Sequence, residues 1–303
     1  MSLWIIFNCL VLILLVLDLG VFHRKAHEIH IREAMLLSAF WIIISLLFNL
    51  VILYMWGHQK ALEFLTGYLV EKSLSIDNLF VFLIVFRFFA VPANYQHKVL
   101  FWGILGALIM RGIFIIAGVT LITKFHWIIY IFGGILLVTG WRLFFERTKV
   151  IHPERNPVLK LLRHYFPVSK DYVGSKFIVS ADGKRVLTPL FVVLVVIETT
   201  DIIFAVDSIP AILAITTDAF IVYSSNVFAI LGLRALFFAL SGIMQLFHYL
   251  HYGLSAILVF IGIKMILSDL IHIPIIIALA FIALTMAVSI LASLLFPAKK
   301  SQG

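Results

Sequence analysis

Two acidic motifs lie within strongly apolar stretches of the sequence. Each contains two carboxylates with five residues between them, Glu71 and Asp77 in the first and Asp201 and Asp207 in the second. With the neighbouring oxygen-bearing residues, the candidate metal ligands are Glu71, Asp77, Asn78, Glu198, Asp201, Asp207 and Ser208. Carboxylate, amide and hydroxyl oxygens suit Mn²⁺, Mg²⁺ or Ca²⁺, whereas Zn²⁺ and Cu⁺ favour imidazole or thiolate. The motifs therefore predict a site for a hard divalent cation.

Three basic residues, Lys72, Arg111 and Arg234, lie in the same apolar stretches. We interpret them as supporting counter-charges that hold the carboxylates, not as contacts for the ion. A carboxylate at the centre of a bilayer needs a partner, a water-filled cavity or an ion. The alternative interpretation is that acids and bases form purely structural ion pairs, but such pairs do not require two motifs of equal spacing.

Helical geometry predicts which side chains of the first motif face the same way. Residues four and seven apart share one face of a helix. Glu71, Ser75 and Asn78 should therefore form one polar stripe.

The second motif should behave differently around its last carboxylate. Glu198, Asp201 and Ser208 fall along one face, whereas Asp207 points about 120° away on an ideal helix. Pro210 lacks a backbone donor and clashes with the preceding turn. We therefore predict local unwinding between Asp207 and Pro210, which would free carbonyl groups as ligands.

The composition identifies the solvent of these motifs as lipid. Of 303 residues, 63% are hydrophobic and 13% charged, which is too apolar for a water-soluble domain of this length. The net charge of +8 could suggest nucleic acid, but Lys and Arg gather between Arg147 and Arg185 and beside apolar runs. That distribution is typical of membrane topology, so no nucleic-acid partner is expected. The single cysteine, Cys9, excludes a disulfide framework.

Apolar runs of about twenty residues can each cross a hydrocarbon core of roughly 30 Å. Nine such runs occur, at residues 3–22, 34–56, 62–89, 98–122, 126–145, 188–215, 220–243, 250–268 and 271–296. With the amino terminus outside, only Lys60 and Lys124 lie in outer loops, and the carboxyl terminus is cytoplasmic. The predicted fold class is thus an all-α polytopic membrane protein.

An internal repeat relates two groups of three helices. Glu71 and Asp77 match Asp201 and Asp207, GALIMRGIF at 106–114 resembles AILGLRALF at 229–237, and GILLVTGWRLF at 134–144 resembles AILVFIGIKMI at 256–266. The two groups begin on opposite sides of the membrane, which is the inverted-repeat plan of secondary transporters. The predicted organisation is two N-terminal helices at 1–60, a first repeat at 61–146, a basic cytoplasmic loop with a β-hairpin at 147–187, an inverted second repeat at 188–268, and a C-terminal helix and tail at 269–303.

Three segments also resemble a known family. EKSLSIDNLFVF at 71–82, ETTDIIFAVDSIPAI at 198–212 and SNVFAILGLR at 225–234 are similar to the signatures of the TerC family, in particular its Alx-like branch. The resemblance implies that the two acidic segments form a metal-ion site. It also implies membership of the wider LysE-like transporter superfamily, a bacterial inner-membrane location, and manganese export or homeostasis.

Two other classes of function stay open at this point. The family name refers to tellurium resistance, but an acidic cavity repels an oxyanion. The resemblance also implies a role without transport, in membrane-protein assembly or metal supply, with a protein partner docking on the 147–187 loop. An enzyme is not expected, because the sequence lacks a nucleophile with a base, a phosphate-binding glycine loop and a cofactor motif, and no tightly bound cofactor is predicted.

Overall fold

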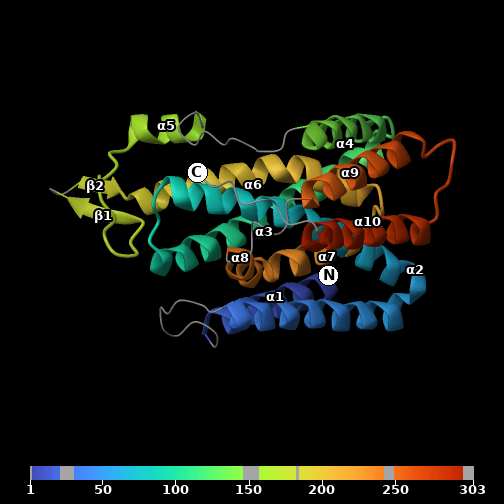
Figure 1. The fold of residues 1–303 in the computed structure, drawn as a ribbon, viewed down its shortest axis with the longest axis horizontal. Helices are drawn as coiled ribbons and strands as arrows, with labels where there is room; N and C mark the ends of the chain where they lie inside the picture. Colours follow the sequence, from blue (N-terminus) through green and yellow to red (C-terminus); the bar gives the residue numbers. More distant parts are fainter. Residues whose placement is uncertain (1, 21–30, 146–156, 182–183, 242–248, 296–303) are drawn as a thin grey trace.

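The computed structural model of this chain is an elongated bundle of helices (Figure 1). It describes all residues except 1, 21–30, 146–156, 182–183, 242–248 and 296–303. The elements in chain order are α1 (Ser2–Gly20), α2 (Ile31–Phe88), α3 (Ala93–Lys124), α4 (Ile128–Phe145), α5 (Pro157–Tyr165), β1 (Ile178–Ala181), β2 (Lys184–Leu187), α6 (Pro189–Leu213), α7 (Ala219–Leu231), α8 (Leu233–Ser241), α9 (Leu250–Ile266) and α10 (Ile275–Leu295).

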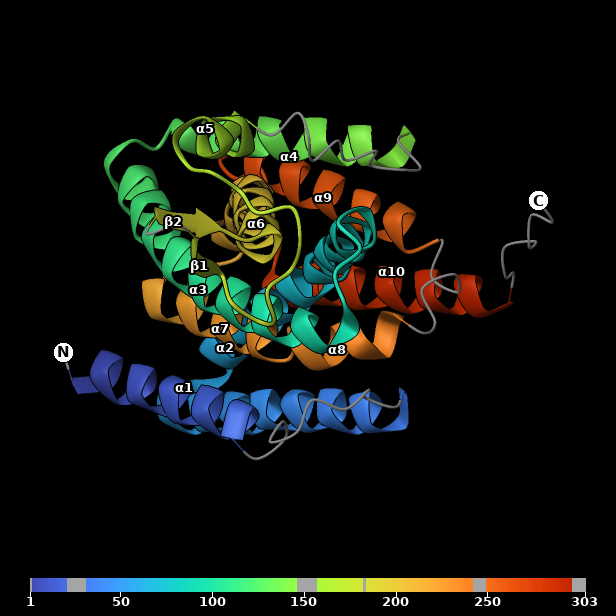
Figure 2. The same cartoon turned by 90° about the vertical axis from the view of Figure 1, so that its left-hand side faces the viewer.

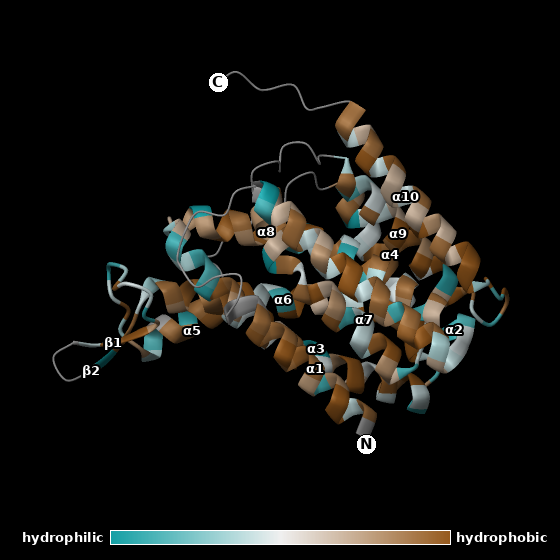
Figure 3. Cartoon of the chain, turned by 90° about the horizontal axis from the view of Figure 1, so that it is seen from below, coloured by the Kyte–Doolittle hydropathy of each residue, from teal (hydrophilic) through white to brown (hydrophobic). Residues whose placement is uncertain are grey.

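The predicted class, an all-α membrane protein, is confirmed. Six spans in the described part of the chain are long and apolar enough to cross a membrane, and α1 and α9 contain shorter apolar segments. Much of the helical ribbon has the colour of hydrophobic residues (Figure 3), and large apolar side chains such as Leu36 and Leu284 are exposed. In a membrane these side chains face lipid, which explains why they need no protein cover.

Two of the predicted spans follow each other along α2 as separate helical halves with a bend between them. The runs at 34–56 and 62–89 are the two halves of α2, which folds back at Gly57, where φ is 81° and ψ is −179°. This backbone conformation is essentially confined to glycine. A Cβ at Gly57 would meet nothing within 4 Å, so the requirement for glycine comes from the backbone alone.

One predicted span is instead divided. The run at 220–243 was expected to form one helix, but it ends as α7 at Leu231 and resumes as α8 at Leu233. A Cβ added to Gly232, between them, would lie 2.8 Å from Lys72 Nζ and 3.0 Å from Trp41 Cβ. The Lys72 ammonium donates to the carbonyl of Ala229 at 3.2 Å. The break is therefore stabilised by a cation at the carboxyl end of α7, where the helix dipole is negative.

The predicted unwinding near Pro210 is wrong. Helix α6 runs without interruption from Pro189 to Leu213 and includes Pro210. A proline inside a helix removes one backbone hydrogen bond without necessarily ending the helix, and surrounding helices can hold it in place. Seen from the end of the bundle, α6 lies inside a ring that includes α3, α4, α7 and α9 (Figure 2).

The segment after α4 contains more structure than was expected. The predicted hairpin is confirmed: β1 and β2 pair antiparallel, with Ile178 opposite Leu187. Helix α5 was not predicted. Lys98 Nζ, on α3, donates to the Ser175 carbonyl at 2.5 Å and lies 4.7 Å from the centre of the Phe177 ring. These contacts hold the segment against the end of the bundle at the left of Figure 1, which is the predicted cytoplasmic end.

Helix contacts follow the order that a two-fold relation between the predicted repeats would give. Helix α2 packs on α7, and the equivalent pair, α6 and α3, also packs together. Helix α4 packs on α9, its own equivalent in the other repeat. A Cβ on Gly133 would lie 3.0 Å from the Gly262 carbonyl oxygen. At the position that the sequence alignment matches to this one, Ser255 donates its hydroxyl to the Gly140 carbonyl at 2.5 Å. The alignment matches Gly133 with Ser255 and Gly140 with Gly262, so equivalent contacts occur twice at the α4–α9 crossing.

Candidate functional site

The guanidinium of Arg111 lies at the meeting point of four helices. Arg111, on α3, is 1% exposed. Its Nη1 donates to Glu71 Oε1 on α2, to Asn226 Oδ1 on α7 at 3.1 Å and to Ser208 Oγ on α6 at 3.4 Å. Its Nη2 donates to Asp201 Oδ1, also on α6, at 3.3 Å. Acids from both predicted repeats therefore share one cation.

The polar stripes predicted from helical spacing position these groups. Ser75 lies one turn after Glu71 and donates to its Oε1 at 3.3 Å, as expected for side chains on one face. Asp201 and Ser208 both reach Arg111, so they too share a face of α6. Glu71 is fully buried, and Arg111 and Ser75 both donate to the same carboxylate oxygen, Oε1.

Several polar atoms of this cluster have unused hydrogen-bonding capacity. Within the described residues, no protein partner reaches Glu71 Oε2, Asp201 Oδ2, Asn78 Nδ2 or Arg111 Nε, although all four atoms are buried. A buried polar atom without a partner costs free energy. Two of these atoms are carboxylate oxygens, which are ligands for hard cations. The formal charges of Glu71, Asp201 and Arg111 sum to −1, so the cluster retains one uncompensated negative charge.

The other carboxylate of the second motif faces a different neighbour. Asp207 Oδ1 accepts a hydrogen bond from Thr139 Oγ1 on α4 at 2.9 Å. This placement agrees with the prediction that Asp207 points away from Asp201 around α6. Asp207 therefore lies beside the α4 and α9 pair rather than in the Arg111 cluster.

Glu198 lies one turn before Asp201 on α6. Its side chain is half-buried and packs so closely on α3 that a methyl group on Gly106 would overlap the carboxylate. No hydrogen bond or ion pair links the Glu198 carboxylate to any residue in the described part of the chain. It is thus an acid beside the cluster with its hydrogen-bonding capacity free.

The counter-charge prediction has different outcomes for its three residues. Arg111 forms ion pairs with Glu71 and Asp201. The Lys72 ammonium is directed to the carboxyl end of α7, and among the described residues it forms no ion pair with an acid; its counter-charge role stays a prediction. Arg234 is 3% exposed, at the start of α8, and its assigned role stays a prediction.

The seven predicted ligands do not form one cage. Glu71, Asp201 and Ser208 meet at Arg111, and Asn78 is buried on the same helix as Glu71. Asp77 is half-buried on α2, while Asp207 and Glu198 have the separate positions described above. Across the part of the chain that the structure describes, no three His, Cys, Asp or Glu side chains are grouped to hold a metal. In this conformation the central acids are occupied by Arg111.

A second cation between two acids lies on α2 three residues after the bend at Gly57. Lys60 Nζ is 3.0 Å from both Glu63 Oε2 and Asp218 Oδ2. Glu63 is buried and also accepts from Thr216 Oγ1 at 2.6 Å. Asp218 caps α7 by accepting from the backbone of Phe220. The cluster ties the α2 bend to the α6–α7 turn at the predicted outer end.

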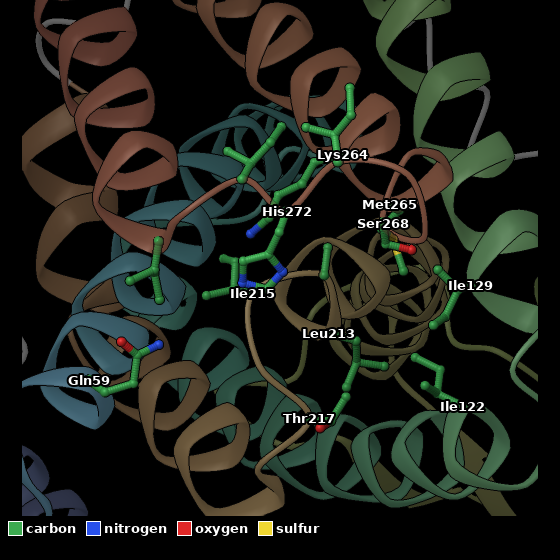
Figure 4. A pocket seen from close by; sticks show the side chains of 14 residues that line it. Gln59, Ile122, Ile129, Leu213, Ile215, Thr217, Lys264, Met265, Ser268 and His272 are labelled. Atoms are coloured by element: carbon green, nitrogen blue, oxygen red, sulfur yellow. The ribbon is translucent and has the colours of Figure 1, made fainter.

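A cavity of about 230 Å³ opens at the same end of the bundle (Figure 4). Its polar lining comes from Gln59, Thr217, Lys264, Ser268 and His272, and its walls are otherwise apolar. Leu213 at the end of α6 also lines it, five residues beyond Ser208. The cavity is therefore closer to the predicted outer surface than the Arg111 cluster is.

Sequence reasoning missed two residues that contact the acids. Asn226 lies within the motif at 225–234 and Thr139 within the repeated segment at 134–144, but neither residue had a predicted role. Both are polar residues within otherwise apolar helices, and that signal could have identified them. Their partners, Arg111 and Asp207, could not be deduced because they lie on other helices.

Comparison with known proteins places the chain among bacterial membrane proteins. The family described as "Integral membrane protein TerC family" matches residues 56–301. A membrane protein of Myxococcus xanthus is 48% identical over 294 residues, covering 97% of this chain and 92% of that protein. "Putative membrane-bound redox modulator Alx" of Salmonella typhi is 45% identical over 291 residues, covering 92% and 90%. No solved structure matches this chain.

Proposed function

The chain belongs to the TerC family of integral membrane proteins, and we propose that it carries a divalent metal cation across the membrane. The observation that carries the proposal is the cluster of buried acids around Arg111, with two carboxylate oxygens that lack protein partners among the described residues. Ionisable groups at bilayer depth are costly, and they commonly mark an ion pathway.

The acids are also distributed along the axis of the bundle. Asp207 follows Asp201 by six residues and Asp77 follows Glu71 by six, which is about 9 Å along each helix. Because the predicted repeats are inverted, Asp207 is displaced toward one membrane surface and Asp77 toward the other. Together with the central pair, they provide carboxylates at three depths. This arrangement supports a route through the protein and not a single structural ion pair.

The ligand chemistry favours a hard divalent cation as the cargo, and we propose manganese. Carboxylates with amide and hydroxyl oxygens from Asn78, Asn226 and Ser208 suit Mn²⁺, Mg²⁺ and Ca²⁺. The resemblance noted from the sequence motifs selects Mn²⁺ among these, acting in export or homeostasis at a bacterial inner membrane. The ion is the transported substrate, and no resident cofactor is proposed.

The name of three relatives refers to redox modulation. This chain contains one cysteine, Cys9, so no disulfide can form within a single chain. We therefore ascribe any redox role of this chain to the cargo ion and not to a thiol switch.

Transport is tested with the purified full-length chain in lipid vesicles, by measuring uptake and release of Mn²⁺, Mg²⁺ and Ca²⁺. We expect Mn²⁺ flux in the native chain and its loss in Asp201→Asn, because the amide removes charge that compensates the ion's lost hydration. Asp171→Asn, an exposed acid of the segment before β1, is the matched control. Absence of flux in the native chain would instead favour the partner-dependent assembly or metal-supply role, with the β1–β2 segment as the candidate contact.

A further inference from the structure

We propose that Arg111 is an exchangeable internal cation, which occupies the ion's place between Glu71 and Asp201 and moves to Glu198 when a divalent ion enters. The inference rests on the proposed function and deepens it, because it assigns the step that opens the site. It changes the expected role of Arg111 from a fixed counter-charge to a competitor of the cargo. It also changes Glu198 from a ligand of the ion to a partner of the arginine.

The first argument is the position of the guanidinium. It bonds to carboxylates on α2 and α6, and also to the Ser208 hydroxyl and the Asn226 carbonyl. These four oxygens belong to the ligand types that a hard divalent cation would use. An ion that binds Glu71 and Asp201 together must therefore take over the oxygens that Arg111 now holds.

The second argument is charge. Glu71 and Asp201 carry two formal negative charges, which one divalent ion neutralises. If Arg111 stayed in place, the site would carry a net charge of +1 with two cations side by side in a buried environment. Like charges at close range in a low dielectric repel strongly. Binding of the ion and departure of the guanidinium are therefore coupled, and each lowers the affinity of the acids for the other.

The third argument identifies where the guanidinium goes. Glu198 precedes Asp201 by one turn of α6, and its carboxylate has no hydrogen bond or ion pair with any described residue. It lies against Gly106, five residues before Arg111 on α3. Side chains on a helix lean toward its amino-terminal end, so the Arg111 side chain extends toward the level of Gly106. A short movement along α3 exchanges Asp201 for Glu198 without exposing the charge to lipid.

Gly106 contributes space to this exchange. A methyl group there would overlap the Glu198 carboxylate, so glycine is what allows the acid to lie flat on α3. Glu198, on α6, thus lies against the helix that carries Arg111, α3. Its carboxylate has no other partner in the described part of the chain.

A double-mutant cycle in Mn²⁺ binding tests the proposal. The Kd for Mn²⁺ is measured with the detergent-solubilised full chain, in the native protein, Arg111→Gln, Glu198→Gln and the double variant. We expect Arg111→Gln to lower the Kd about tenfold or more, because the competing cation is gone. Glu198→Gln should raise the Kd in the native background, because Arg111 then has no second partner, and should have no effect when Arg111 is already Gln. Arg185→Gln, an exposed arginine of β2, is the control.

The outcomes separate this inference from the proposed function. If Glu198→Gln weakens binding equally in both backgrounds, Glu198 is a ligand of the ion and the exchange is refuted. If Arg111→Gln weakens binding, Arg111 does not compete and the inference also fails, while transport stands. Absence of Mn²⁺ binding and flux in the native chain would overturn both proposals.

A second variant covers the case in which Arg111→Gln does not fold without metal. Arg111→Lys keeps the charge but loses the forked geometry that reaches both acids, so it should fold and bind Mn²⁺ more tightly than the native chain. Recovery of folded Arg111→Gln on addition of Mn²⁺ would support the same conclusion, because the ion then replaces the missing cation. Binding by Arg111→Lys no tighter than that of the native chain would contradict it.

Discussion

The two predicted repeats carry matched charges on backbones that differ. In the first repeat, α3 is continuous from Ala93 to Lys124, and its arginine, Arg111, reaches the central acids. In the second, the corresponding helix breaks at Gly232, two residues before Arg234. Lys72, from the first repeat, donates to the Ala229 carbonyl at the buried carboxyl end of α7. Matched sequence positions therefore do not guarantee matched backbones.

The largest expected effect concerns the orientation of the repeats, because an inverted relation requires the two ends of α6 to face opposite sides of the membrane. Cysteines are introduced at Asp171 and Thr217, both exposed, in a Cys9→Ser background. An impermeant external reagent should label position 217 and not position 171, an all-or-none difference, because the positive-inside pattern places these segments on opposite sides. External labelling at 171 would refute the inverted arrangement.

The next largest effect concerns the equivalent acids Asp77 and Asp207. Replacing either with asparagine should abolish Mn²⁺ flux in vesicles, because each substitution removes a negative charge from the route while keeping the size of the side chain. Melting temperature and detergent-extracted yield should stay close to those of the native chain. Asp269→Asn, at an exposed outer acid that bonds to Tyr130, is the control. Flux that survives in one variant only would show that the two halves do not contribute equally.

A smaller effect is expected on stability when a glycine at the break between α7 and α8 is replaced, compared with a glycine inside the continuous helix α4. Gly232→Ala adds a methyl group 3.0 Å from Trp41 Cβ and should lower the free energy of unfolding by about 1–3 kcal/mol. Gly134→Ala is the matched control, because a Cβ there meets nothing within 4 Å. The measurement is thermal unfolding of both variants in detergent. Equal melting temperatures would mean that the break tolerates side chains and does not depend on close packing.

The smallest expected effect is at the α4–α9 crossing. Ser255→Ala removes one hydrogen bond to the Gly140 carbonyl and should cost about 0.6 kcal/mol, the typical value for interhelical hydrogen bonds in membranes. Gly133→Ala, at the aligned position, should cost more, since its Cβ would lie 2.7 Å from Ile266 Cγ1. The free energies of unfolding of the two variants are measured in the same detergent and compared. A larger loss in Ser255→Ala than in Gly133→Ala would contradict the packing described for this crossing.

The sequence predicted the membrane class, the spans, the hairpin and the faces of the acidic stripes, because these depend on composition and local periodicity. It separated the two halves of α2 on either side of Gly57, but it did not predict the break at Gly232 or the continuity of α6 through Pro210. These features depend on neighbours that are distant in the sequence, such as Trp41 and Lys72 at Gly232. The bonds that Arg111 makes to four oxygens depend equally on the packing of three other helices, so residue spacing could suggest its role but not its partners.

The glycine contacts between α4 and α9 also set which motions the bundle can make. Backbone atoms meet there directly, with Gly133 against the Gly262 carbonyl and Ser255 against that of Gly140. Such surfaces have few side-chain rotamers to adjust, so the two helices can tilt about their crossing but resist sliding or separation. We therefore expect this pair to act as a pivot, about which the helices that carry Glu71 and Asp201 rock to open one face of the membrane and then the other.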